Sequence, residues 1–222
     1  MKVLPIKPEE AEPWLLKKHY SKRMCPISYA FGIYRDKQLI GVVTYGTPVS
    51  SALRVGVCGE QWMDNVIELN RLCCNNEKNV ASILVGRSLK MLPKPLVVVS
   101  YADTEQGHVG YVYQATNFVY TGLSAKRTDW KLKGMEHLHG ATVADMSRGQ
   151  ENRAQWMRDK FGDDFYLEDR ARKHRYVYFV GSQGQKKLMQ SALMYDTEPY
   201  PKGDSKRYDA GGVVQTQQLL FL

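Results

Sequence analysis

Residues Leu96–Gly122 read LVVVSYADTEQGHVGYVYQATNFVYTG, and the rest of the chain is interpreted around them. The first four, Leu96–Val99, are apolar and rich in β-branched side chains, a pattern that predicts a buried strand. The run stops at Ser100–Asp103, where hydroxyls and a carboxylate follow the strand, and Gly107 and His108 open a predicted short helix. A carboxylate between a strand end and a helix start resembles the ligand sites of open α/β sheets. We therefore expect a ligand site here.

Hydrophobic periodicity on both sides of this stretch predicts an alternation of strands and helices. Strands are expected at 1–6, 28–34, 39–45, 66–72, 118–120 and 176–181, and helices at 8–16, 79–92 and 150–161. Residues 53–58 are expected to form a strand or a loop edge, and residues 137–143 an edge strand. The segment 198–208 is rich in proline, glycine and cations and is expected to be a loop.

The composition is that of a globular protein with a polyanionic partner. The chain has 222 residues, 43% hydrophobic and 24% charged, with a formal net charge of +8. Such a surplus favours nucleic acid as the partner, although a basic surface also serves solubility. The four cysteines contain no C-x-x-C pair, which indicates a reducing compartment. No apolar run or leader pattern predicts a membrane span or a signal peptide, so we expect a cytoplasmic protein, in the host cell if a phage encodes it.

The element order resembles the acyl-CoA N-acyltransferase fold of the GNAT type, an α/β fold with a central mixed sheet flanked by helices. In this resemblance VIELNRL (66–72) is the fourth strand, LVVVSYAD (96–103) is the fifth, and the two splay apart to admit a thioester. NNEKNVAS (75–82) then matches the pyrophosphate loop, with Asn79 in place of a glycine and Ala81 retained. Asparagine suits that place because it adopts left-handed backbone conformations readily. One domain over residues 1–222 is expected, with 124–222 supplying the last strands and basic, DNA-contacting extensions.

A second resemblance covers most of the chain. The motifs HYSKR, IGVVTYG, ELNRL, the stretch quoted above, KHRYVYF and PYPKG occur in the order found in the phage Mom family. That family adds a carbamoylmethyl (acetamido) group to the exocyclic amine of adenine in DNA and so protects phage DNA from restriction. The resemblance implies double-stranded DNA as substrate, acetyl-CoA or a related acyl-CoA as donor, and iron as cofactor. Simple acetyl transfer gives an N-acetyl amine, and so it cannot give the carbamoylmethyl product, whose added group ends in a carboxamide.

The resemblance also assigns roles to individual residues. Carried over by position, the implied metal ligands are His19, Tyr20 and Asp103, and Glu68 on the neighbouring strand is a further candidate ligand or base. The implied catalytic residues are Tyr20, Asp103, Tyr113 and His108, with Tyr113 at the place of a general acid. The implied cofactor contacts are Arg71, Asn79, Ala81, Ser82 and Tyr113. Each has a plainer alternative: Asp103 and His19 as cap residues, Glu68 as a solvated side chain, His108 as a packing residue, and Tyr111 and Tyr113 as core aromatics.

Chemistry on adenine also requires that the base leave the stack and that cations hold the phosphates. The candidate DNA-binding residues are Lys22, Arg23, Lys126, Arg127, Trp130, Lys131, Arg170, Arg172, Lys173 and Arg175. A charge run is more often a solvated face. Two rival functions stay open: an ordinary acetyltransferase acting on a protein or small amine, and a non-catalytic phage DNA-binding protein.

Overall fold

A computed structural model describes residues 1–138 and 140–203 of the chain. Its main part is a seven-stranded mixed sheet in which every neighbouring pair is antiparallel except β4 and β5. In spatial order the strands are β1 (Lys2–Pro5), β2 (Tyr29–Arg35), β3 (Gln38–Gly46), β4 (Val66–Cys74), β5 (Leu96–Asp103), β9 (Lys173–Val180) and β6 (Val119–Leu123).

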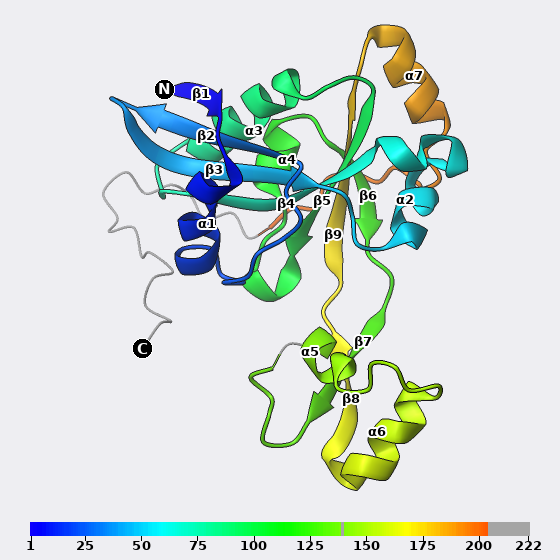
Figure 1. Cartoon of the computed structure of the whole chain (residues 1–222). Helices are drawn as coiled ribbons and strands as arrows, with labels where there is room; N and C mark the ends of the chain where they lie inside the picture. The colour runs from blue at the N-terminus through cyan, green and yellow to red at the C-terminus, as the bar shows by residue number, and fades with distance from the viewer. Residues whose placement is uncertain (139, 204–222) are drawn as a thin grey trace.

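Helices cover both faces of this sheet (Figure 1). On one face lie α3 (Val80–Met91) and α4 (Tyr111–Ala115), over the largest core cluster. The other face carries α1 (Pro8–Lys17), α2 (Ser51–Cys58) and α7 (Gln183–Ser191), which pack over two smaller clusters. Short 3-10 turns lie at Glu60–Asn65, Thr104–Gln106 and Gly162–Asp164. Within the described part of the chain, none of the helices is both long and apolar enough to cross a membrane.

The parallel strands β4 and β5 diverge, as the resemblance to the GNAT fold predicted. They pair only between Val66–Leu69 and Val97–Ser100, although β4 continues to Cys74 and β5 to Asp103. Beyond the paired stretch the strands separate and leave room between them. The predicted α/β fold with a central mixed sheet is therefore confirmed.

A bulge at Asn70 changes which side chains of β4 share a face. Thr44 of β3 lies opposite Arg71, whereas Tyr45 lies opposite Leu69, so Asn70 is skipped in the pairing. Before the bulge Ile67 and Leu69 face the largest core, and after it Leu72 and Cys74 do. Arg71 consequently shares the opposite face with Glu68, because a bulge re-aims the side chains that follow it.

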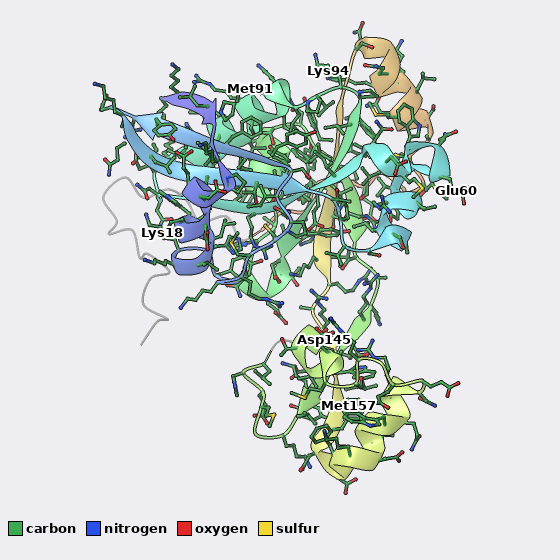
Figure 2. The ribbon with its side chains drawn as sticks, viewed as in Figure 1. Lys18, Glu60, Met91, Lys94, Asp145 and Met157 are labelled. Carbon is green, nitrogen blue, oxygen red and sulfur yellow. The ribbon has the colours of Figure 1, made fainter. Side chains whose placement is uncertain are left out.

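A smaller lobe projects from this body (Figure 1). We call residues 127–170 the lobe and the other described residues the body. The lobe contains the two-stranded sheet β7 (Arg127–Leu132) and β8 (Phe165–Arg170), with α5 (Gly140–Asp145) and α6 (Arg153–Phe161). Its own core is formed by Leu132, Val143 and Met157, and Met157 lies among its elements in Figure 2. The single domain over residues 1–222 stays a prediction, and 204–222 lie outside the described residues.

Two expected elements were wrong, and one expected helix starts late. Residues 53–58, expected as a strand or loop edge, belong to helix α2, because the Ser50 side chain caps it by accepting from the Leu53 N–H. Of residues 137–143, expected as an edge strand, 140–143 instead form the start of helix α5, which buries Val143 in the lobe core. The short helix expected from Gly107 begins at Tyr111 instead.

Candidate active site

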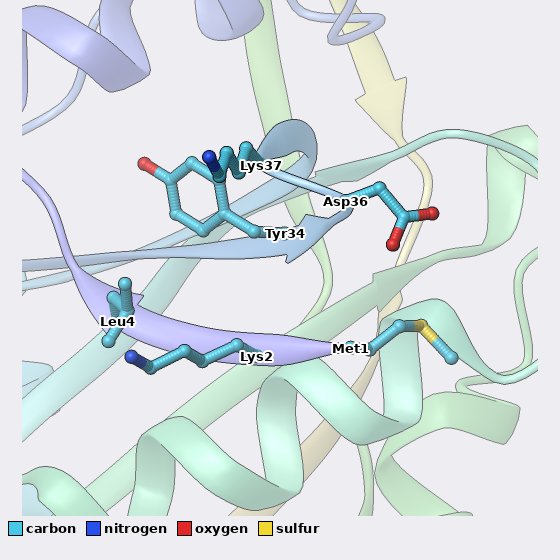
Figure 3. Close-up of a pocket in the computed structure, with 6 residues that line it drawn as sticks. All are labelled: Met1, Lys2, Leu4, Tyr34, Asp36 and Lys37. Atoms are coloured by element: carbon cyan, nitrogen blue, oxygen red, sulfur yellow. The ribbon is translucent and has the colours of Figure 1, made fainter.

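A cavity of about 1150 Å³ lies where β4 and β5 diverge and the body meets the lobe. It is lined from the body by the segment after α1, by β4, by the end of β5 and by the loop into α4, and from the lobe by β7 and β8. A smaller hollow of about 530 Å³ between the first strand and the β2–β3 turn contains none of the predicted site residues (Figure 3). The larger cavity is the candidate site.

His19 and Tyr20 reach this cavity from the end of the first helix. The two rings stack with centroids 4.4 Å apart, and the Tyr20 hydroxyl donates to Oδ2 of Asp103 at 3.4 Å. Tyr20 also meets the edge of the His108 ring, with centroids 6.4 Å apart. The structure thus brings together four predicted site residues from two segments that lie about eighty residues apart in sequence.

The segment that carries His19 and Tyr20 is anchored by Asn70, which the sequence analysis did not single out. Its Nδ2 donates to the Pro26 carbonyl at 2.7 Å, while its Oδ1 accepts from Thr44 Oγ1 at 2.7 Å and from Cys25 Sγ at 3.3 Å. Gly46 allows this approach, since a Cβ there would lie 2.0 Å from the Pro26 oxygen. A polar residue within an otherwise largely apolar strand pattern is the signal that the sequence offered.

The Asp103 carboxylate accepts hydrogen bonds from two groups besides the Tyr20 hydroxyl. Its Oδ1 accepts from the Glu105 N–H at 3.1 Å, so the cap reading of this residue is correct. Its Oδ2 accepts from Lys173 Nζ at 2.7 Å, across the β5–β9 pair. Lys173, predicted as a phosphate contact, therefore serves as the counter-ion of a buried carboxylate.

Burial keeps the imidazoles of the site neutral. Burial, followed by the charges of Arg71, His108 and Lys173, lowers the pKa of His19 to about 4. The pKa of His108 is also lowered by burial, with Asp103 opposing the shift. Nδ1 of His19 accepts from the Ser21 N–H at 3.1 Å. A neutral ring with that nitrogen accepting carries its proton on Nε2, so His19 can donate a hydrogen bond.

Glu68 and Arg71 form the β4 wall of the cavity. Burial raises the pKa of Glu68, against the opposing charges of Arg71 and Lys173. Arg71 donates from Nη1 to the Asn70 carbonyl at 2.7 Å, but its buried Nε has no hydrogen-bond partner among the described residues. An unmet donor on a cation is costly in a protein interior, so this N–H suits an oxygen acceptor of a bound molecule.

Tyr113 and Tyr111 line the same cavity in different ways. Tyr113 is buried against Phe118 and Tyr176, and burial raises its pKa to about 12 while a hydrogen bond with Ser100 opposes the shift. Tyr111, in contrast, is 57% exposed. The core reading fits Tyr113 but is wrong for Tyr111.

Comparison of the sequence with known proteins identifies the family of this chain. The sequence matches the Mom protein family over residues 1–202. The chain belongs to this family. A relative, the methylcarbamoylase mom of Escherichia phage Mu, is 28% identical over 209 residues, which cover 89% of this chain and 84% of the relative.

Solved structures with a similar course of the chain are acetyltransferases. A GNAT-family acetyltransferase from Bacillus cereus ATCC 10987 is 11% identical with a TM-score of 0.42, covering 80% of this chain and 96% of its own. The Bacillus subtilis acetyltransferase in complex with CoA is 12% identical with a TM-score of 0.43, covering 81% and 98%. The strand order and the divergence of β4 from β5 carry the fold assignment.

The cofactor loop implied by the GNAT resemblance lies apart from the cavity. Asn79 has φ 65°, the left-handed conformation expected of it, and precedes α3. Ser82 Oγ donates to the Asn79 carbonyl at 3.1 Å. Asn79, Ala81 and Ser82 do not line the cavity, whereas Arg71 and Tyr113 do.

The iron site implied by the Mom-family resemblance does not fit the arrangement of its ligands. Within residues 1–138 and 140–203, no three His, Cys, Asp or Glu side chains converge as a metal site would require. His19, Glu68 and Asp103 are therefore not one ligand group. The physical reason lies in their partners, because Nδ1 of His19 is turned onto Ser21 and Asp103 is held by Lys173.

The predicted DNA-binding residues divide into exposed side chains and side chains that bond to other parts of the protein. Arg172 donates to the carbonyls of Ser124 at 2.5 Å and Leu123 at 3.1 Å, where the lobe joins the body. Arg175 donates to Thr121 and lies 3.3 Å above the Tyr195 ring.

Two further DNA-binding candidates also contact other side chains of the protein. Trp130 packs against Phe165 beside the lobe core, with ring centroids 5.1 Å apart, and Lys131 pairs with Glu168 at 3.3 Å. Such side chains serve the fold first. The remaining candidates are exposed: Lys22, Arg23, Lys126, Arg127 and Arg170.

Proposed function

We propose that this protein modifies adenine in DNA by adding a carbamoylmethyl group to the exocyclic amine, and so protects phage DNA from restriction. The observation that carries the proposal is the match to the Mom protein family over residues 1–202, with the phage Mu methylcarbamoylase as a relative. The meeting of His19, Tyr20 and Asp103 in one large cavity supports it, because these residues hold the family's motif positions.

In the proposed transfer, the adenine nitrogen bonds to the group carried by the donor and loses one proton, while the bond between that group and the donor sulfur breaks and its electron pair leaves on the thiolate. Asp103 is our candidate acceptor of that proton, and the Tyr20 hydroxyl bonded to it orients the pair. Neutral His19 donates from Nε2 to an oxygen of the bound donor, and the unmatched Nε–H of Arg71 donates to an oxygen as well.

An acyl-CoA donor, such as acetyl-CoA, is the second part of the proposal. The separation of β4 and β5 leaves room for a thioester, and the N–H groups that begin α3, a twelve-residue helix, suit a pyrophosphate. Tyr113 lies on the cavity wall as the candidate acid for the thiolate, with a pKa that burial raises to about 12.

Iron is the family expectation, and no step of the proposal depends on it. If the protein binds iron through Asp103, metal analysis of the purified wild type should find it and that of Asp103→Ala should not. Equal iron in both proteins contradicts the assignment of Asp103 as a ligand.

Mass spectrometry of nucleosides tests the proposed function. DNA from cells that express the protein should contain carbamoylmethylated deoxyadenosine, and DNA from cells that express Asp103→Asn should not. Unmodified deoxyadenosine beside abundant soluble wild-type protein would sink the proposal. If the protein is instead an ordinary acetyltransferase, the His19→Ala and Asp103→Ala variants should still transfer acetyl groups from acetyl-CoA to a protein or small amine.

A further inference from the structure

Tyr111, the first residue of α4, is an aromatic side chain that the proposed chemistry does not use. It is 57% exposed and lines the cavity, whereas Tyr113 is 7% exposed. Among the described residues, no other aromatic ring stacks on it. An aromatic ring left open inside a cavity offers its faces to a planar ligand.

The ring is held in place from both ends. Gly110, with φ 81°, lies so close to the Tyr176 ring that a Cβ there would be 2.4 Å from it. The Tyr176 hydroxyl donates to the Val109 carbonyl at 2.5 Å, which fixes the backbone before α4. At the tip, the Tyr111 hydroxyl accepts from the Gly203 N–H at 3.1 Å. A rigid aromatic ring loses little conformational entropy when a ligand stacks on it.

The rest of the cavity suits a base that is attached to phosphate. Arg23, Arg71 and Arg127 line it together with Tyr111, so the cavity that holds the open ring also holds three cations. Aromatic faces combined with cations are the usual arrangement for single-stranded or flipped bases. Resting on the proposed function, we propose that Tyr111 stacks on the adenine drawn out of the DNA duplex.

A purine ring could reach this site from two sources, the target adenine or the adenine of a CoA donor. The predicted pyrophosphate residues Asn79, Ala81 and Ser82 lie outside the cavity, whereas Tyr111 lies inside it. In CoA the pyrophosphate lies between the adenine and the arm that ends in the thioester. A donor bound through that loop therefore keeps its adenine on the loop's side, away from the reacting groups. The geometry therefore favours the target adenine.

Binding to defined oligonucleotides tests the stacking without requiring turnover. Fluorescence anisotropy compares the full-length protein on two single-stranded oligothymidylates, one with a single central adenine and one with an abasic site there. The wild type should prefer the adenine strand, and Tyr111→Leu should lose about tenfold in affinity for it, the scale of one stacked base. Tyr111→Phe should keep the preference because it keeps the ring. Tyr34→Ala, in the separate hollow of Figure 3, is the matched control and should behave as wild type.

Calorimetric titration with CoA distinguishes the two sources. If Tyr111→Leu keeps the adenine preference but binds CoA more weakly, the ring stacks on the donor and the proposal is overturned. A preference that survives in both Tyr111→Leu and Tyr111→Ala overturns it too. If the wild type yields no modified nucleoside, yet only the variants without a ring at position 111 lose the preference, the proposed reaction fails and the stacking stands.

Discussion

The body and the lobe line one cavity but differ in charge and in what their polar side chains do. Residues 127–170 contain eight lysines and arginines against nine aspartates and glutamates, so the whole positive excess of the chain lies outside the lobe. In the body, Asp103, Lys173, Asn70 and Tyr20 form hydrogen bonds that converge on the cavity. This difference places both the chemistry and the main attraction for a polyanion on the body, with the lobe as a wall of the cavity.

The comparison predicts that one cavity carboxylate is essential and another is not. Asp103→Asn preserves the acceptor for the Glu105 N–H but removes the charge, so we expect carbamoylmethyl-adenine to fall by about 100-fold or more. Asp169→Asn in the lobe, which also lines the cavity, should change the yield only about twofold. The measurement is nucleoside mass spectrometry at equal protein levels. Equal losses in both variants would break the division of roles.

Two fully buried methionines test whether the body and lobe have separate cores. Met157→Ala should lower the free energy of opening the lobe by about 2–5 kcal/mol, because it leaves a cavity beside Leu132 and Val143. Hydrogen exchange should then speed up in the lobe while β5 and β9 stay protected. Met189→Ala, at the buried residue of α7, is the matched change in the body and should have the reverse effect. Faster exchange of both regions in Met157→Ala would show one cooperative core.

Asn70 is expected to matter for the body beyond its contribution to stability. Asn70→Ala removes the partners of the Pro26 carbonyl and of Thr44, which should cost about 1–3 kcal/mol and also release the segment that carries His19. Thermal unfolding and adenine modification should both decrease. Asn65→Ala, which removes one bond to the Pro95 carbonyl outside the cavity, is the control. If Asn65→Ala reduces modification as strongly, the anchoring role is wrong.

Acid should destabilise the protein through its neutral histidines. The folded protein keeps the pKa of His19 at about 4, against 6.5 for the free side chain, so the unfolded state binds more protons between these values. The contribution of His19 to stability is complete above pH 6.5 and decreases as the pH falls towards 4. Melting temperatures at pH 7 and pH 5 should differ less in His19→Gln than in wild type, with His108 leaving a residual dependence. An unchanged difference contradicts a buried neutral His19.

The smallest expected effect concerns the salt dependence of DNA binding. Arg23 is exposed in the segment of the body that follows α1. Arg23→Ala should reduce the slope of log affinity against log salt by about 1, the value for one lost phosphate contact. Arg158→Ala, an exposed lobe cation, should leave the slope unchanged. Salt titrations by anisotropy on one duplex measure both. If only Arg158→Ala changes the slope, the phosphate contact lies on the lobe and not on the body.

Local patterns predicted the elements that depend on nearby residues. The apolar run at 96–99, the helix ended by Pro93 and the left-handed Asn79 all follow from side-chain chemistry within a few positions. Of the two lobe helices, α6 was expected at 150–161 and is found at Arg153–Phe161, whereas α5 was not predicted. Residues 137–143 have a short β-like pattern that is overridden where α5 buries Val143 against the lobe core.

The ordered motifs determined the family of this chain, and the apolar and helical patterns determined most of its elements, because both are written in neighbouring residues. Only the tertiary structure decided that Arg71 shares a face with Glu68, since the bulge at Asn70 depends on pairing with β3. It likewise decided that Lys173 neutralises Asp103 and that Tyr111 stays open while Tyr113 is buried. Strand register and packing join residues tens of positions apart, and no periodicity within one segment can specify them.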